Sequence, residues 1–261
     1  MSKKRLIPKL QLKTSSTNLS KTVLVITKQF DQVFEIGDPV SQSKIYQDQA
    51  ADELIFINID RNRNGVENLC KIIRKVSEEI FMPITVGGGV SNEEDFRNLL
   101  SNGADKISIN TFAVRDPMFI KLSSEKFGAQ CVVVSIDYKK ELDGTYKVYI
   151  NNGQEKTNLD PNSWAIECEK MGAGEILLTS IDNDGIRNGL NLEISEKISN
   201  NLSIPVINSG GCGNAKHFID GFLKGKADGI SCGTFFALQD QSFMQTRSQI
   251  KNAGIDIRVH T

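Results

Sequence analysis

Histidine is the scarcest titratable residue of this chain, because only His217 and His260 occur among its 261 residues. We therefore expect neither an imidazole-based metal centre nor a histidine-dependent catalytic triad. The five cysteines are scattered, mostly within apolar segments, and show none of the paired spacings typical of zinc sites. The pattern predicts reduced core thiols in a cytoplasmic protein, with no metal and no cofactor.

Long hydrophobic runs and an excess of charge of one sign are missing as well. No apolar run approaches bilayer length, and the basic residues at 1–5 are not followed by the apolar region of a secretory signal. A net charge of −1 gives no electrostatic reason to expect nucleic acid or a membrane as a partner. With 39% hydrophobic residues the chain can bury one large core, so we predict a single domain over residues 1–261.

The most informative stretch that is present occurs twice. Residues 83–90 read Pro-Ile-Thr-Val-Gly-Gly-Gly-Val, and residues 205–212, 122 positions later, read Pro-Val-Ile-Asn-Ser-Gly-Gly-Cys. The segments 53–60 and 104–112 return in the same way, at offsets of 122 and 123. Chance similarity between strands would not keep one spacing across about sixty residues, so the repeat predicts a duplicated half.

Strand-like apolar runs alternate with helical patterns along the whole chain. We predict strands at 5–11, 53–58, 83–86, 106–110, 131–137, 175–180, 204–208 and 229–233. We predict that helices follow them at 38–49, 66–80, 92–102, 117–127, 161–171, 192–200, 215–224 and about 240–253. Two inserts interrupt the order: a long excursion with a short strand at 23–26, and a hairpin-like insert at 146–150 closed by a turn at 151–153.

Eight strands, each followed by a helix, are typical of a (β/α)8 TIM barrel. The repeat predicts an internal half-barrel duplication, with halves at about 1–127 and 128–261. An open, doubly wound sheet is the alternative, and it explains the duplication less well.

In such a barrel, functional residues lie at the carboxyl ends of the strands. Glycines there let backbone amides close around an anion, usually phosphate, although they also serve tight turns and close helix packing. Two clusters half a barrel apart would hold a small molecule with a phosphate at each end. The first cradle comprises Gly88, Gly89, Asn110 and Thr111, and the second cradle comprises Gly210, Gly211, Gly233 and Thr234.

Candidates for proton transfer lie between the cradles. Asp137 ends the fifth strand after an apolar run, where a charge is unusual unless it serves a function. Asp182 and Asp184 follow the sixth strand, and one of them could be a turn or capping residue. By the duplication, Gln11 faces Asp137, and glutamine can hydrogen-bond a substrate but cannot carry a proton. Gln11 therefore argues against chemistry that needs two carboxylates.

Charged residues open several strands at the other end of the predicted barrel. If they point inward, they form a balanced ring of two cations and two anions that closes the barrel floor. If they point outward, they form ordinary surface ion pairs that add little stability. The four residues are Arg5, Glu53, Lys106 and Glu175.

Eight segments together resemble the HisF family, the cyclase subunit of imidazole glycerol phosphate synthase: 5–8, 37–40, 52–56, 85–89, 103–111, 133–137, 172–185 and 209–211. The most specific is Gly-Ala-Gly-Glu-Ile-Leu-Leu-Thr-Ser-Ile-Asp-Asn-Asp-Gly at 172–185. The resemblance covers nearly the whole chain and implies two phosphate sites and a HisH-like glutaminase subunit docked on the floor. It also implies that ammonia enters past the ring of four charged residues, which resembles the family's gate, and travels up the barrel to the substrate. Asp137 and Asp184 match functional aspartates of the family.

Two departures from the family pattern point to a particular branch. The family carries an aspartate where this chain has Gln11, and its lysine-containing loop corresponds here to Ile-Thr-Lys-Gln-Phe at 26–30. The first loop, with residues 59–60 and 151–153, looks closer to a paralogous branch associated with acetamidino groups on bacterial surface sugars. Our leading hypothesis is a subunit that receives ammonia and uses or relays it for amidine formation on a glycan sugar. The substrate would be a phosphorylated or nucleotide-linked small molecule, with a third synthetase as a further partner.

Three alternatives remain open at this point. The first is an authentic cyclase of histidine biosynthesis that tolerates Gln11, and the second is a non-catalytic ammonia conduit. The third is a sugar isomerase on a related single-chain barrel, which fits less well because that chemistry wants both aspartates and no gate.

Overall fold

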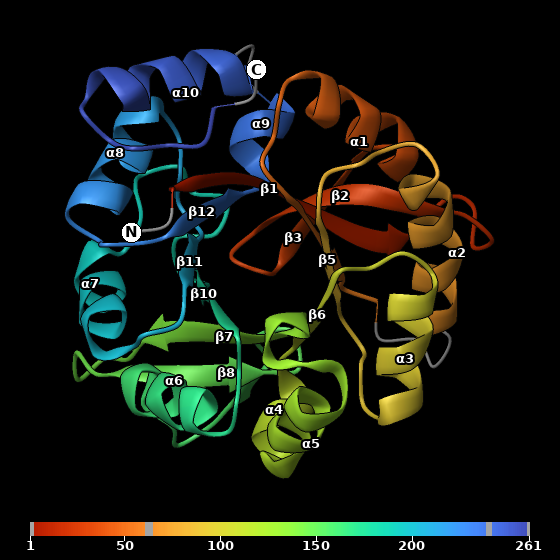
Figure 1. The fold of residues 1–261 in the computed structure, drawn as a ribbon, viewed down its shortest axis with the longest axis horizontal. Coiled ribbons are helices and arrows are strands. Elements are labelled where there is room, and N and C mark those ends of the chain that lie inside the picture. The colour runs from red at the N-terminus through yellow and green to blue at the C-terminus, as the bar shows by residue number, and fades with distance from the viewer. Residues whose placement is uncertain (1–2, 61–64, 239–241, 260–261) are drawn as a thin grey trace.

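Eight parallel strands close into a barrel in the computed structural model, which describes residues 3–60, 65–238 and 242–259 (Figure 1). Closure is made where the last strand pairs with the first, with Arg5 opposite Gly229. The predicted (β/α)8 TIM barrel is confirmed, and the open-sheet alternative is wrong. In barrel order the strands are β1 (Arg5–Thr14), β4 (Leu54–Asn58), β5 (Ile84–Gly87), β6 (Lys106–Ile109), β7 (Val132–Lys140), β10 (Glu175–Ser180), β11 (Val206–Ser209) and β12 (Gly229–Cys232).

Helices cover the outside of the barrel (Figure 1). Most begin at an Asp, Asn or Ser whose side chain accepts a hydrogen bond from the third helical amide, such as Asp38, Asn92 and Asp160. The long helices are α1 (Pro39–Asp48), α2 (Gly65–Ser77), α3 (Glu93–Ser101), α5 (Met118–Phe127), α6 (Pro161–Lys170), α7 (Leu192–Asn201), α8 (Ala215–Leu223) and α10 (Phe243–Asn252). The predicted start of the last helix, near 240, lies outside the described residues. Three short helices were not predicted: α4 (Thr111–Arg115), α9 (Thr234–Leu238) and the 3₁₀ turn η1 (Ala129–Cys131).

The strands are buried on both faces because side chains alternate between the helical layer and the barrel interior. On β1, Leu6, Leu10 and Leu12 pack into the large core beneath the helices. A second, smaller cluster fills the middle of the barrel and consists of Ile7, Ile55, Val133, Leu177 and Ile207, with Ile57 against it. The barrel interior is therefore a packed apolar layer between two polar ends.

Two hairpins extend the strands at the mouth of the barrel. After β1, the strands β2 (Thr22–Lys28) and β3 (Gln32–Gly37) continue the sheet antiparallel, and after β7 the strands β8 (Tyr146–Ile150) and β9 (Glu155–Lys156) do the same. The prediction of one short strand at 23–26 was therefore incomplete, and β1 and β7 run past their predicted ends because the hairpins pair with them. The predicted turn at 151–153 is confirmed by its positive φ angles. Hairpins on strands four apart support the half-barrel duplication, which stays a prediction.

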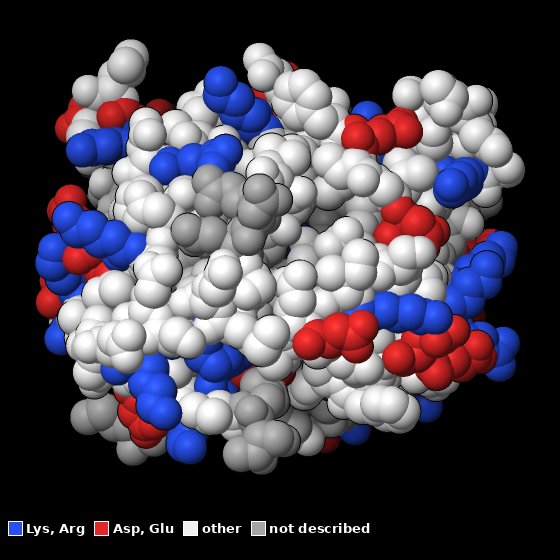
Figure 2. All heavy atoms as spheres, turned by 90° about the horizontal axis from the view of Figure 1, so that it is seen from above, with Lys and Arg blue, Asp and Glu red and all other residues white. Residues whose placement is uncertain are grey.

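On the side that carries α10 and α1, acidic and basic side chains of the described residues are mixed over the surface (Figure 2). Among the described residues, no helix is both long and apolar enough to cross a bilayer.

Candidate functional site

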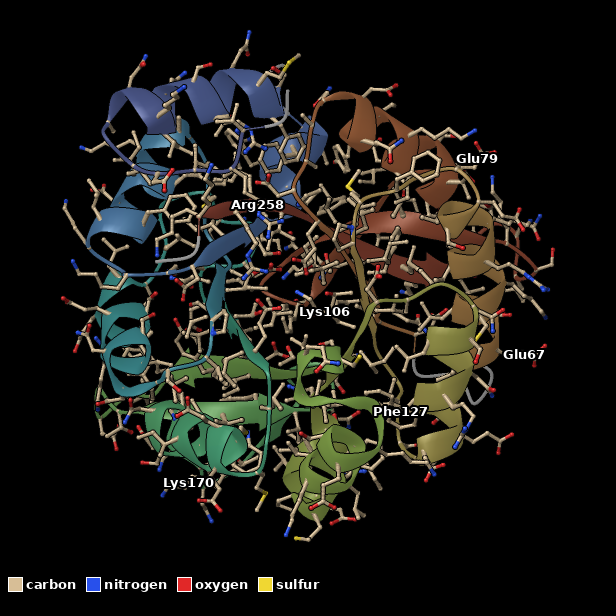
Figure 3. All side chains as sticks on the ribbon, viewed as in Figure 1. Glu67, Glu79, Lys106, Phe127, Lys170 and Arg258 are labelled. Atoms are coloured by element: carbon tan, nitrogen blue, oxygen red, sulfur yellow. The ribbon has the colours of Figure 1, made fainter. Side chains whose placement is uncertain are left out.

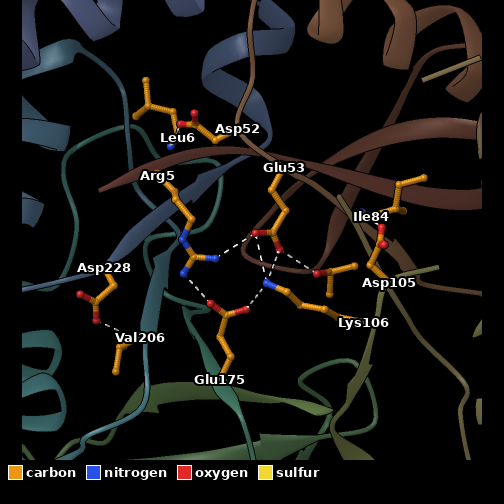
Figure 4. Close-up of polar contacts among 11 residues, drawn as sticks. Arg5, Leu6, Asp52, Glu53, Ile84, Asp105, Lys106, Glu175, Val206 and Asp228 are labelled. Atoms are coloured by element: carbon orange, nitrogen blue, oxygen red, sulfur yellow. Dashed lines mark hydrogen bonds and ion pairs between the residues drawn. The ribbon is translucent and has the colours of Figure 1, made fainter. Parts of the chain in front are cut away.

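The four charged residues predicted for the floor meet inside the barrel (Figure 4). Arg5 donates to Glu53 at 2.9 Å and to Glu175, and Lys106 Nζ lies 3.1 Å from Glu53 Oε1 and 2.9 Å from Glu175 Oε2. Thr85 Oγ1 adds a hydrogen bond to Glu53 at 2.8 Å. Each cation therefore bridges both carboxylates, and the ring is closed.

The ring belongs to the interior and is not a set of surface ion pairs. Figure 3 shows Lys106 directed toward the middle of the barrel, whereas Glu67 and Lys170 lie on the outer helices. Arg5 and its two carboxylate partners are buried, and only the Lys106 side chain, 21% exposed, reaches solvent. Burial alone would lower the pKa of Arg5, but Glu175 and Glu53 outweigh that effect and raise it.

Asp137 stands at the opposite end of the barrel and lines the mouth cavity. Ser135 Oγ lies 3.4 Å from one carboxylate oxygen, and Asn110 Nδ2 donates to the other at 3.3 Å. Burial raises the pKa of Asp137 to about 6, the nearby Lys9 amine opposes the rise, and Asp184 adds to it. A carboxyl group with such a pKa can exchange a proton near neutral pH.

Gln11 is tied into a chain of polar contacts that leads to Asp184. Its amide Nε2 donates to Thr27 Oγ1 at 3.0 Å, and Thr27 Oγ1 donates to Asp184 Oδ2. Lys9 Nζ approaches the other oxygen of Asp184 at 3.8 Å. Gln11 and Asp137 line one cavity from opposite sides of the barrel, as the duplication predicted.

Asp182 and Asp184 have separate roles. The Asp182 carboxylate accepts a hydrogen bond from the Lys140 amide at 2.8 Å and is absent from the residues that line the cavities, so it is the turn residue of the pair. Asp184 is 6% exposed and belongs to the mouth.

Lys9 and Thr27 are functional candidates that sequence reasoning missed. Both are buried, at 7% and 5% exposure, although both are polar. Strand alternation could have found Lys9, because Gln11 was predicted to face Asp137 across the barrel and odd positions of one strand share a face. Thr27 could not have been found, because its place depends on how the β2–β3 hairpin folds back over the mouth.

The first cradle opens into a cavity of about 860 Å³. Gly88 (φ +98°) lies so close to β4 that an added Cβ would be 2.1 Å from the Asn58 carbonyl oxygen, which explains the glycine. Thr111 Oγ1 accepts a hydrogen bond from the Asn151 amide at 2.9 Å, so the turn between β8 and β9 packs beside this cradle. All four residues predicted for the first cradle line the cavity together with Gln11 and Asp137.

The four residues predicted for the second cradle also come together, but around a pocket of only about 10 Å³. The Gly189 amide donates to the Gly211 carbonyl at 2.8 Å, which holds the segment after β10 against the glycines. Lys9 and Asp184 complete the lining. Among the described residues, no group of three or more His, Cys, Asp and Glu side chains could hold a metal ion.

Fold and site together define a (β/α)8 barrel with a charged floor, an apolar middle and a polar mouth. The model of the histidine biosynthesis protein family matches residues 5–241, and the chain belongs to that family. A protein of Prochlorococcus marinus (strain MIT 9313), provisionally named imidazole glycerol phosphate synthase subunit hisF2, is 46% identical over 260 residues, 99% of each chain.

Two other relatives are named imidazole glycerol phosphate synthase subunit HisF. The protein of Clostridium botulinum (strain Okra / Type B1) is 43% identical over 231 residues, 88% of this chain and 91% of its own. The protein of Bacillus cereus (strain Q1) is 40% identical over 256 residues, 98% of this chain and 99% of its own. The chain is therefore a HisF-like synthase subunit and an enzyme of that type.

Proposed function

We propose that this subunit receives ammonia from a glutaminase partner at the barrel floor and uses or relays it at the mouth. The product would be an amidine on an N-acetyl sugar bound for a bacterial surface glycan. The single observation that carries this proposal is Gln11 opposite Asp137, above a floor ring that keeps all four charges.

The barrel interior favours the passage of a neutral molecule over that of an ion. Above the ring lies the apolar layer of Ile7, Ile55, Val133, Leu177 and Ile207, where an ammonium ion would lose its hydration without gaining a partner. Ammonia carries no charge and can cross such a layer. Lys106 would be the ring member that moves aside, since it is the most exposed of the four.

Among the carboxyl groups described at the mouth, Asp137 has a raised pKa that suits proton transfer near neutral pH. When ammonia attacks the carbonyl carbon of an acetamido group, its nitrogen must lose two protons and the carbonyl oxygen must leave with them as water. Asp137, with its pKa of about 6, is placed to accept a proton from the nitrogen and to return it to the departing oxygen. Gln11 can hydrogen-bond a carbonyl oxygen but cannot act as the second acid or base. This difference favours amidine formation over the cyclase reaction of histidine biosynthesis, which is the second candidate because relatives over 40% identical are named HisF.

Purified protein supplied with the phosphoribulosyl cyclase substrate and an ammonium salt separates the two candidates. We expect little turnover, with the Clostridium botulinum HisF protein as the positive control, and a gain of activity in Gln11→Asp. Robust turnover by the unmodified chain, or complementation of a strain lacking the cyclase, would establish the cyclase and defeat our preference.

The amidine itself is detected by isotope transfer. The chain is combined with its glutaminase, a synthetase and a nucleotide-linked N-acetyl sugar, and glutamine labelled with ¹⁵N at the amide is added. We expect ¹⁵N in an acetamidino group by mass spectrometry. Asp137→Asn should slow this transfer by a factor of about 10² to 10⁴ if Asp137 is the base. An unchanged rate would mean that the chain is a passive conduit.

A further inference from the structure

Two aromatic side chains of the described residues are exposed, and one lies at each end of the barrel. Phe34 is 52% exposed on the β2–β3 hairpin at the mouth, and Phe81 is 92% exposed in the segment between α2 and β5. That segment leads into the amino end of β5, so Phe81 lies on the floor. A phenyl group gains free energy when it leaves water, so one that is held almost wholly in water favours contact with a partner.

The chain on either side of Phe81 is fixed, and the phenyl group is therefore held out from the floor. Ile80 before it is buried, and Met82 after it packs against the large core. The Phe81 amide donates to Gln47 Oε1 on α1. Because the backbone is already anchored, less conformational freedom is lost when a partner covers the side chain, and the cost of binding falls.

The segment that follows Phe81 runs between two members of the floor ring (Figure 4). The carbonyl of Pro83 accepts a hydrogen bond from the Leu54 amide at 2.9 Å, and Leu54 directly follows Glu53. On the other side, the first residue of β5 donates its amide to the carboxylate that precedes Lys106, at 2.8 Å. Two residues span at most about 7 Å, so Phe81 lies beside the entrance to the floor ring.

We propose that Phe81 is the aromatic anchor by which the glutaminase subunit docks on the barrel floor. Its phenyl group enters an apolar pocket of that subunit, and this contact excludes water beside the floor ring. Lys44 and Glu79 form an exposed ion pair at 2.7 Å near Phe81, and together they supply the polar rim of the interface. The seal matters because ammonia that escapes into bulk water is protonated to ammonium. The inference rests on the proposed function for the identity of the partner.

The test measures the affinity of the full chain for the HisH-type glutaminase encoded in the same genome, by isothermal titration calorimetry. Loss of a buried aromatic anchor weakens an interface by a factor of about 30 or more, and we expect at least this loss in Phe81→Ser. Leu142→Ser is the matched control, because Leu142 is also exposed but lies in the turn between β7 and β8. Its affinity should stay within about threefold of wild type. Both variants should keep the wild-type urea unfolding midpoint, because neither side chain is packed.

Hydroxyl-radical footprinting of the unmodified chain makes the test independent of any variant. We expect the Phe81 side chain to be oxidised in the free chain and protected in the complex, with Leu142 oxidised equally in both. An affinity of Phe81→Ser within about threefold of wild type, or equal oxidation of Phe81 with and without the glutaminase, would overturn the inference and leave the partner in place. No binding of the glutaminase to the unmodified chain at micromolar concentration would overturn the inference and the proposed function together.

Discussion

Replacing Asp137 with asparagine should stabilise the protein at neutral pH. Burial raises the pKa of this carboxyl group from 3.8 to about 6 in the folded chain. Each pKa unit corresponds to about 1.4 kcal/mol, so keeping Asp137 ionised costs about 3 kcal/mol of folding free energy. Asparagine has the same shape, can still contact Ser135 and Asn110, and carries no charge. For a domain of this size the gain corresponds to an increase in Tm of roughly 6 to 12 °C.

The sign of the pH dependence follows from the raised pKa. Between pH 3.8 and about 6 the folded chain holds a proton on Asp137 that the unfolded chain has lost, so wild-type stability falls as the pH rises through this window. Asp137→Asn should therefore match wild type near pH 4 and exceed it near pH 8 in thermal unfolding. Asp48→Asn, at an exposed site on α1, controls for net charge. Equal Tm values at pH 8, or the same gap at both pH values, would refute this account of Asp137.

Three further substitutions test the fold beneath the site, each by its urea unfolding midpoint. Gly88→Ala should destabilise the protein by several kcal/mol more than Gly144→Ala. Both glycines have positive φ, but only at Gly88 would the added Cβ lie 2.1 Å from a carbonyl oxygen. Equal losses of stability would contradict this steric clash. Glu53→Gln should lower the free energy of unfolding by about 3 to 5 kcal/mol, because Arg5 and Lys106 each lose one of their two carboxylate partners inside the barrel. A loss below about 1 kcal/mol would mean that Glu53 interacts only weakly with these two cations. Asn208→Val should stabilise by about 1 to 3 kcal/mol, because the buried Asn208 side-chain amide has no hydrogen-bond partner among the described residues and Val86 occupies the equivalent position of the first half. A loss of stability would show that the amide is satisfied.

The floor of the barrel shows how far sequence reasoning reaches. Arg5, Glu53, Lys106 and Glu175 were placed there because each opens a strand, and their strands do bring them together. The sequence left open whether they point inward, since a strand's first residue can face either way. The closed barrel decided the question, because two cations and two carboxylates meet only if all four turn toward the axis.

The mouth shows where local pattern fails. Asp137 and Gln11 were paired from the repeat, which works because equivalent strands of a duplicated barrel stand opposite each other. The position of Thr27 and the β2–β3 hairpin could not be predicted, because neither periodicity nor residue spacing indicates a contact between residues 27 and 184. The difference in volume between the pockets at the two cradles could not be predicted either, because both cradles have the same kind of sequence.

The sequence by itself determined the alternation of strands and helices, the repeat and the residue types at both ends of the barrel. These features are local, because hydrophobic period, capping residues and glycine positions act over a few residues. Only the tertiary structure decided that the ring closes, that Lys9 approaches Asp184, and that the first cradle opens into about 860 Å³ whereas the second borders about 10 Å³. These outcomes depend on distances across a closed sheet and on where a hairpin comes to rest, which no short stretch of chain encodes.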